Sequence, residues 1–224
     1  MFRIATHSDV SGFVPLWQEA FGDSEPFIRQ FFDRFPNCIS YADEEDGKLV
    51  SMVHALPQLL SPDTLAVYIY AVATDKAYRG RGLCAGLMAF AEEDLKRRGI
   101  QCAVLRPGEP SLFGFYGKMG YEATFTRYRS AFPGGKPISR AEYAALREPL
   151  ISVPHLIYDD RLLAYAETMY GLTFYRTETG IAAASADYVG EVLPEDLGGK
   201  PYAMVKWLGT PRPVSDGYLG FSLE

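Results

Sequence analysis

The chain has 224 residues, which is enough for one large domain or two small ones. Its 48% apolar and 22% charged residues are ordinary for a globular protein, and its net charge of -6 excludes a broad basic surface for nucleic acid. The sequence has no signal-peptide pattern, no membrane-spanning apolar run and no metal-ligand spacing of its three cysteines. We therefore expect a cytoplasmic protein with no metal site and no nucleic-acid or membrane partner.

The first 74 residues predict two helices followed by a run of strands. The first helix has an N-cap candidate at Ser8 or Asp9 and a stop at Gly22, and Pro15 would kink or split it. The second helix carries phenylalanines at helical spacing. The turn EEDG separates two of the strands and is typical of a hairpin. We expect a strand around Ile4, helices over 10–21 and 24–35, and strands over 38–43, 48–60 and 65–74.

The segment YRGRGLCAGL, residues 78–87, places two arginines and three glycines ahead of a long helical pattern. Glycines allow conformations and close approaches that a Cβ blocks, and a helix N-terminus offers unpaired N–H groups with a partial positive charge. These features predict a phosphate or pyrophosphate site, to which both arginines add charge. A GxxxxGK[ST] loop is absent, and Gly80, Gly82 and Gly86 miss the dinucleotide spacing GxGxxG by one residue.

The segment that follows predicts a crossover between parallel strands. A helix over 82–99 has one apolar stripe and ends at Gly99, and a buried strand over 101–107 comes next. A strand, a helix and a second strand in this order favour a parallel βαβ unit. SLFGFYGKMGYE then predicts a short helix with a turn at Gly120, followed by a strand over 121–132.

FPGGKP, residues 132–137, is the best candidate for a domain boundary because it is rich in glycine and proline. The order of elements beyond it, helices and then short strands, loosely echoes the N-terminal region and indicates a degenerate internal repeat. We expect helices over 139–148 and 159–171, and strands over 172–177, 180–185, 188–193, 202–209 and 218–224.

Two motifs resemble those of a known family. Residues 79–84, RGRGLC, resemble the [RQ]xxGx[GA] signature of the GNAT acetyltransferases (Gcn5-related N-acetyltransferases), with Cys84 in place of the final glycine or alanine. Residues 115–121, FYGKMGY, are similar to the FYxKxGF pattern that many members carry after the fifth strand. The resemblance covers residues 1–131 well, and the longer pattern is nearest the enhanced-intracellular-survival-type branch.

The resemblance implies an α/β fold with a central mixed sheet, helices on both faces and a V-shaped split where the coenzyme enters. We expect residues 1–133 to form this GNAT domain. Residues 137–224 would form a smaller α+β domain packed on the first, interpreted as a degenerate second GNAT copy.

The resemblance also implies the transfer of an acetyl group from acetyl-coenzyme A, as co-substrate, to an amine of a small molecule or peptide. Tyr116 takes the position of the general acid. The residues implied in coenzyme binding are Ala71, Val72 and Ala73 on the fourth strand and Arg79, Gly80, Arg81, Gly82, Leu83 and Cys84 in the loop. The general base is not assigned, and its candidates are His54, Glu109 and the terminal carboxylate of Glu224.

A second hypothesis is a catalytically inactive coenzyme-A-binding sensor or scaffold. It is favoured by Cys84 and by the absence of a glutamate from the fourth strand, where many family members place one. The sequence does not name the acceptor, and it is compatible with a homo-oligomer.

Overall fold

The structure is a computed structural model that describes residues 1–210 and 216–222. The chain divides into two compact units. The first comprises Met1–Pro57, Leu65–Leu105 and Trp207–Pro211, and the second comprises Gln58–Thr64, Arg106–Lys206 and Arg212–Glu224. The domain boundary expected at residues 134–136 stays a prediction. Among the described residues, none of the helices combines the length and apolar character needed to cross a bilayer.

The first unit contains most of the elements expected before residue 106. They are β1 (Phe2–Ile4), the 3₁₀ helix η1 (His7–Asp9), α1 (Val10–Phe21), α2 (Glu25–Arg34), β2 (Ile39–Glu45), β3 (Lys48–Leu60), β4 (Thr64–Thr74), the 3₁₀ helix η2 (Lys76–Tyr78), α3 (Leu83–Arg97) and β5 (Cys102–Leu105). The helix and strand predictions for this region are confirmed, except that Pro15 does not split the first helix: α1 is one continuous helix from Val10 to Phe21.

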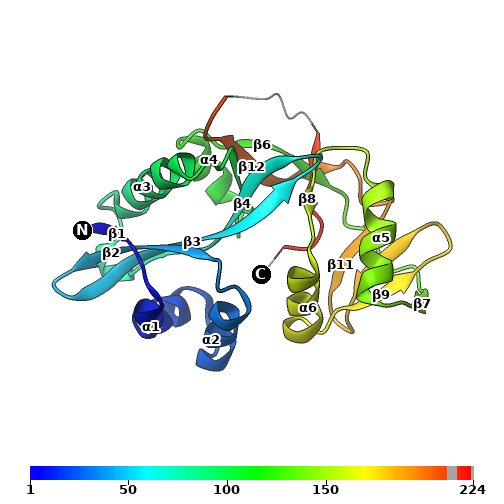
Figure 1. Cartoon of the computed structure of the whole chain (residues 1–224), viewed down its shortest axis with the longest axis horizontal. Coiled ribbons are helices and arrows are strands. Elements are labelled where there is room, and N and C mark those ends of the chain that lie inside the picture. The colour runs from blue at the N-terminus through cyan, green and yellow to red at the C-terminus, as the bar shows by residue number, and fades with distance from the viewer. Residues whose placement is uncertain (211–215, 223–224) are drawn as a thin grey trace. The chain divides into compact units, whose positions relative to one another are not determined.

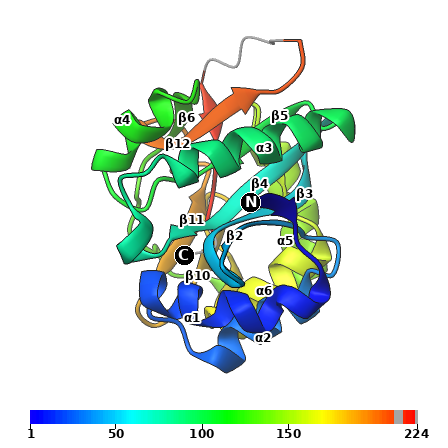
Figure 2. The ribbon, with the colours of Figure 1, turned by 90° about the vertical axis from the view of Figure 1, so that its left-hand side faces the viewer.

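The strands of the first unit form a mixed sheet in the order β1-β2-β3-β4-β5. The β1–β2 and β2–β3 pairs are antiparallel, whereas β4 and β5 are parallel, as the predicted crossover through α3 requires. Helix α3 covers one face of this sheet, and α1 and α2 cover the other (Figures 1 and 2). The expected mixed sheet flanked by helices is therefore confirmed.

Aromatic side chains fill the space between the sheet and α1 and α2. The Trp17 ring centre lies 5.5 Å from that of Tyr70 on β4 and 5.2 Å from that of Phe31 on α2. The Trp17 and Phe31 side chains are fully buried. Because β4 contributes Tyr70 to this core, the packing holds one side of the strand that leads to the glycine loop.

The second unit contains the remaining elements. They are α4 (Ser111–Gly117), β6 (Glu122–Arg127), β7 (Lys136–Pro137), α5 (Arg140–Leu150), β8 (Leu156–Ile157), α6 (Asp160–Met169), β9 (Thr173–Arg176), β10 (Ile181–Ala184), β11 (Val189–Leu193), β12 (Lys200–Trp207) and β13 (Gly217–Tyr218). Strand β6 lies between β12 and β13, and a separate antiparallel sheet has the order β11-β10-β9-β7. The expected small C-terminal α+β region is thus present, and Lys136–Pro137 of the boundary motif is the edge strand of its sheet.

The strand expected over 218–224 is mostly wrong. Only Tyr218 of this range lies in a strand, and residues 219–222 are irregular. The backbone carbonyls of this segment accept hydrogen bonds from side chains and not from a neighbouring strand. Arg127 donates to the Gly220 carbonyl at 2.9 Å, and Tyr158 donates to the Phe221 carbonyl at 2.7 Å. Leu223 and Glu224 lie outside the described residues.

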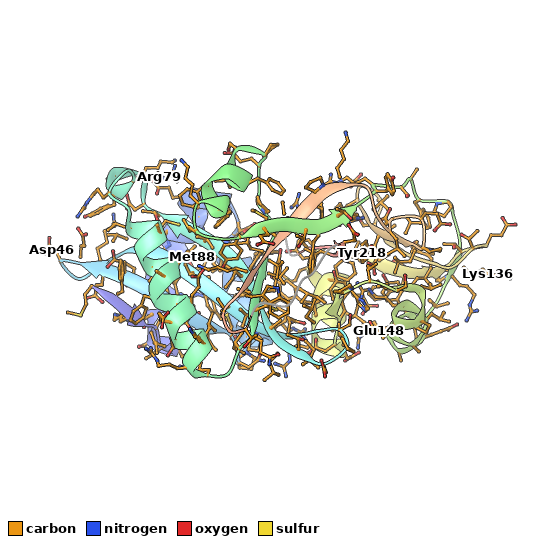
Figure 3. All side chains as sticks on the ribbon, turned by 90° about the horizontal axis from the view of Figure 1, so that it is seen from above. Asp46, Arg79, Met88, Lys136, Glu148 and Tyr218 are labelled. Carbon is orange, nitrogen blue, oxygen red and sulfur yellow. The ribbon has the colours of Figure 1, made fainter. Side chains whose placement is uncertain are left out.

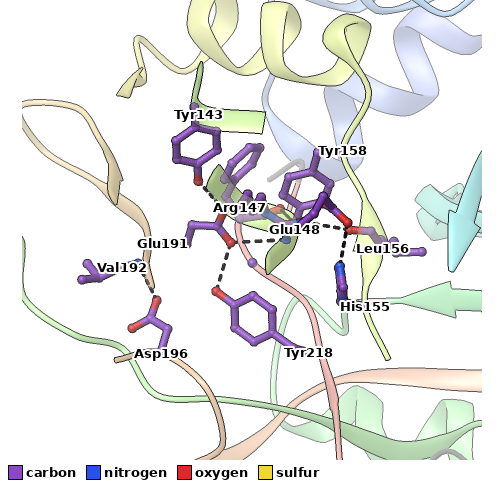
Figure 4. Close-up of polar contacts among 12 residues, drawn as sticks. Tyr143, Arg147, Glu148, His155, Leu156, Tyr158, Glu191, Val192, Asp196 and Tyr218 are labelled. Atoms are coloured by element: carbon purple, nitrogen blue, oxygen red, sulfur yellow. Dashed lines mark hydrogen bonds and ion pairs between the residues drawn. The ribbon is translucent and has the colours of Figure 1, made fainter. Parts of the chain in front are cut away.

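A buried carboxylate, Glu191 on β11, joins several elements of the second unit (Figure 4). It accepts hydrogen bonds from the hydroxyls of Tyr143 and Tyr218, and from Arg147 Nε at 2.7 Å. Burial acts to raise the pKa of Glu191, but the charge and hydrogen bond of Arg147 outweigh it and hold this pKa below its usual value. The network therefore ties β11, α5 and β13 together around one ion pair.

Candidate functional site

Strand β4 extends well beyond its partner β5, the last strand of the first unit's sheet. Their parallel ladder ends where Ile69 lies opposite Leu105, while β4 continues to Thr74. Just beyond this point Ala71 has a φ of 47°, a left-handed conformation that a non-glycine residue rarely adopts and that costs about 1–3 kcal/mol. A strained residue therefore lies on β4 just past the end of its ladder with β5, and the V-shaped split at the fourth strand stays a prediction.

The loop after β4 contains two glycines in a conformation that requires glycine. Gly80 has a φ of 77° and Gly82 a φ of 76°. A Cβ built on either residue would meet no protein atom within 4 Å, so packing against other side chains does not explain them. They shape an open stretch of backbone, the glycine cradle (residues 79–84), whose space a Cβ on either glycine would fill.

The cradle opens directly into the N-terminus of α3, of which Gly82 is the N-cap residue (Figure 3 labels Arg79 in the loop and Met88 on the helix). No side chain caps this helix, whereas Ser24, Ser139 and Asp159 cap α2, α5 and α6. The N–H groups of its first turn are therefore available to an anion, and the helix dipole favours negative charge there.

Gly86, the third glycine of the segment, has a different role. A Cβ at Gly86 would lie 2.5 Å from the ring of Phe2 on β1. Gly86 therefore allows α3 to pack closely on the sheet, a requirement that is independent of phosphate.

The two arginines of the loop differ in their contacts. Arg81 pairs with Glu45 through two hydrogen bonds of 2.8 and 3.1 Å and lies over the Tyr78 ring. Arg79 donates its Nε to the Thr74 carbonyl at 3.0 Å. Glu45 therefore partly balances the charge of Arg81, and the expectation that both arginines add positive charge to the site stays a prediction.

Leu83 and Cys84 form the first helical positions of α3 and are both partly exposed. Burial raises the pKa of the Cys84 thiol to about 11. The thiol is therefore protonated at neutral pH and is not an activated nucleophile.

Tyr116 belongs to α4 in the second unit and is 7% exposed. Its ring centre lies 5.2 Å from that of Phe115 and 5.9 Å from that of Tyr121. The backbone N–H of Tyr121 donates to the Tyr116 carbonyl at 3.2 Å, which closes the turn of the FYGKMGY motif. The motif thus fixes the tyrosine through both its helix and its following turn.

The candidates for a general base have different environments. His54 is fully buried, its Nδ1 lies 2.8 Å from the Ser40 hydroxyl, and burial lowers its pKa to about 3. Such a histidine is a core residue and a weak base at neutral pH. Glu109 is exposed and accepts a hydrogen bond from Ser111, and Glu224 lies outside the described residues.

No group of three or more histidine, cysteine or acidic side chains with metal-binding geometry occurs in the part of the chain that the structure describes.

A comparison with protein families matches residues 1–124 to the acetyltransferase (GNAT) domain. The chain belongs to the GNAT acetyltransferase family. The matched range includes β4, the glycine cradle and the tyrosine motif. A comparison with curated proteins gave no match.

Solved structures support the same GNAT fold over most of the chain. A conserved protein from Enterococcus faecalis V583, described as a "Probable N-Acyltransferase", has a TM-score of 0.71 at 17% identity, covering 93% of this chain and 72% of its own. A GCN5-related N-acetyltransferase from Kribbella flavida has a TM-score of 0.64 at 18% identity, covering 86% and 57%. A transcriptional regulator from Bacillus halodurans C-125 has a TM-score of 0.50 at 22% identity, covering 59% and 99%. At these identities the likeness shows the fold and not the substrate.

Sequence reasoning missed two features of the site. The left-handed conformation of Ala71 has no signal in the sequence, because alanine is not a residue that favours it. The pairing of Arg81 with Glu45 joins residues 36 positions apart, and only the folded hairpin of β2 and β3 makes it visible.

Proposed function

We propose that this GNAT protein transfers the acetyl group of acetyl-coenzyme A to an amine of a small molecule or peptide. The observation that carries the proposal is the open cradle of Gly80 and Gly82 at the uncapped N-terminus of α3. An anion is the ligand that this backbone suits, and the family motif in the same residues favours the coenzyme pyrophosphate. The narrower likeness to the enhanced-intracellular-survival-type branch is part of the proposal.

When bound, acetyl-coenzyme A supplies an activated acetyl thioester. The residues of the cradle, from Arg79 to Cys84, would hold the pyrophosphate through backbone N–H groups. The segment of β4 beyond the ladder with β5, which contains Ala71, Val72 and Ala73, would offer backbone groups to the thioester carbonyl and the pantetheine arm. Preorganised N–H groups of this kind stabilise the negative charge that develops on the carbonyl oxygen.

Proton transfer completes the proposed reaction. An alkyl amine has a pKa near ~10 and arrives protonated, so it must lose a proton before it attacks the carbonyl. The Tyr116 hydroxyl would give a proton to the departing thiolate, a role assigned from its motif. No side chain is assigned as the general base. Without one, the acceptor ammonium would lose its proton to a chain of water molecules or directly to solvent.

The inactive sensor or scaffold is the second candidate function. It is favoured by the environment of His54, the one histidine on the strand next to β4, whose low pKa makes it a poor base. A protein of this kind would bind acetyl-coenzyme A without releasing its thiol.

A panel of amines, aminoglycosides and peptides, each mixed with acetyl-coenzyme A, tests the proposal. We expect thiol release with at least one acceptor and a matching gain of one acetyl group on that acceptor by mass spectrometry. Binding of acetyl-coenzyme A without acetylation of any acceptor class would contradict the proposed acetyltransferase activity and support the inactive sensor or scaffold.

A further inference from the structure

The hairpin tip between β2 and β3, residues 45–48, contacts the loop that carries the glycine cradle through two ion pairs. Glu45, the last residue of β2, accepts hydrogen bonds from Arg81 Nη2 at 2.8 Å and from Arg81 Nη1 at 3.1 Å. Lys48, the first residue of β3, places its Nζ 2.5 Å from Asp75 Oδ2. Both ion pairs lie within the first unit.

The cations of the two ion pairs share the ring of Tyr78. The Arg81 Cζ lies 5.3 Å from the ring centre, and the Lys48 Nζ lies 5.6 Å from it. Arg81 is the cation that belongs to the glycine cradle, where Gly80 and Gly82 flank it. A change of partner at Arg81 therefore changes the charge beside the proposed phosphate site.

The ion pair of Glu45 and Arg81 is exposed enough to exchange partners. The Glu45 side chain is 28% exposed and the Arg81 side chain is 50% exposed. Exposed ion pairs add little to stability because water and salt screen them. A guanidinium fork suits phosphate oxygens as well as carboxylate oxygens, and a pyrophosphate brings more negative charge than one carboxylate. A pyrophosphate in the glycine cradle would therefore compete with Glu45 for the same fork.

The loop keeps its attachment to β3 without this ion pair. The backbone N–H of Asp75 donates to the Val50 carbonyl on β3 at 2.9 Å, and the side chain of Asp75 holds Lys48. Neither contact involves Glu45. Arg81 can therefore change partners while the loop stays in place.

We propose that Glu45 is an internal counter-anion that the coenzyme pyrophosphate displaces from Arg81. Before binding, Glu45 occupies the fork of Arg81. On binding, the fork turns to the phosphate oxygens and the Glu45 carboxylate returns to water. Glu45 therefore lowers the affinity for acetyl-coenzyme A and for the product coenzyme A alike, which favours product release. The identity of the anion rests on the proposed function, whereas the competition at Arg81 does not.

Calorimetric titration with inorganic pyrophosphate tests the competition without the coenzyme and without any turnover. Glu45→Gln and Arg81→Gln break the same ion pair, so a purely structural pair would change both affinities in the same direction. We expect Glu45→Gln to bind pyrophosphate about threefold or more tighter than the unaltered protein, and Arg81→Gln about tenfold or more weaker. Affinities that fall in both variants, or an unchanged affinity in Glu45→Gln, would overturn the proposal.

A matched control and a salt series separate charge from packing. Glu25→Gln breaks an exposed ion pair of the same kind, between Glu25 and Arg29 on α2 at 2.7 Å, and removes an equal charge. We expect Glu25→Gln to bind pyrophosphate like the unaltered protein at every salt concentration. The gain in Glu45→Gln should shrink as sodium chloride is added, because salt screens exposed charges. A gain that does not depend on salt would overturn the counter-anion role.

The same titrations with coenzyme A test the identity of the anion. We expect the same order of affinities, with Glu45→Gln tighter and Arg81→Gln weaker than the unaltered protein. This order with pyrophosphate but not with coenzyme A would overturn the assignment to the coenzyme. The order with both probes, with no amine acetylated, would leave the role of Glu45 standing and contradict the proposed activity. A protein that binds neither probe would overturn both.

Discussion

Among single residues, Tyr116 carries the most specific chemical prediction. Tyr116→Phe keeps the ring that packs beside Phe115 and Tyr121 but removes the hydroxyl proton. We expect kcat to fall by roughly 10²–10⁴ while the KM for acetyl-coenzyme A changes little, because the lost proton transfer belongs to the chemical step. Steady-state kinetics would show this. Tyr128→Phe, at a tyrosine that is 56% exposed, is the matched control, and a Tyr116→Phe activity within about twofold of that control would remove Tyr116 from the acid role.

His54 makes a prediction about pH at the same scale. Burial lowers its pKa from 6.5 to about 3, so the folded protein keeps this histidine neutral where the unfolded chain protonates it. The resulting stability is complete above pH 6.5 and is lost as pH falls from there toward 3, by at most about 1.4 kcal/mol per pH unit. Denaturant unfolding at several pH values should show a shallower loss in His54→Phe than in the unaltered protein. The same slope of unfolding free energy against pH in both proteins would contradict a lowered pKa of His54.

At the scale of elements, β6 depends on strands that come from the far end of the chain. It lies between β12 and β13, with Phe125 opposite Ala203 in one ladder and opposite Gly217 in the other. A chain ending at Pro133 loses both neighbours and leaves two open strand edges. We expect it to aggregate or to bind a hydrophobic dye and to lose acceptor turnover. A soluble, monomeric and fully active product would instead make the C-terminal region an independent module.

Elements with a local signal could be predicted from the sequence, and those set by distant partners could not. The helix over 10–21 has local cap and stop residues and appears with the same limits in the structure. The segment 218–224 has a strand-like pattern, but the side chains of Arg127 and Tyr158 donate to the carbonyls of Gly220 and Phe221. The edge strand Lys136–Pro137 pairs with Arg176 and Tyr175, partners that no local pattern indicates.

At the scale of the whole molecule, the two motifs of the site lie in different compact units. The glycine cradle belongs to the first and Tyr116 to the second. The sequence could place both motifs because each is a short run with its own turn or helix. It could not predict the charge balance at the glycine cradle, since Glu45 and its partner Arg81 lie 36 positions apart. Local motifs therefore predicted the family, while the charge balance around the glycine cradle depends on a long-range pair.

The central claim is that the cradle binds the pyrophosphate of acetyl-coenzyme A, and a pair of glycine variants tests it most directly. Gly82 and Gly99 stand at opposite ends of α3 with φ values of 76° and 81°, and a Cβ on either meets no protein atom within 4 Å. Valine at either position therefore brings a similar backbone strain, but only at Gly82 would it occupy the proposed phosphate space. The measurement is the shift of the thermal unfolding midpoint on adding acetyl-coenzyme A, which reports binding to the folded state. We predict a clear rise for the unaltered protein and for Gly99→Val and none for Gly82→Val; an equal rise in both variants would contradict the account.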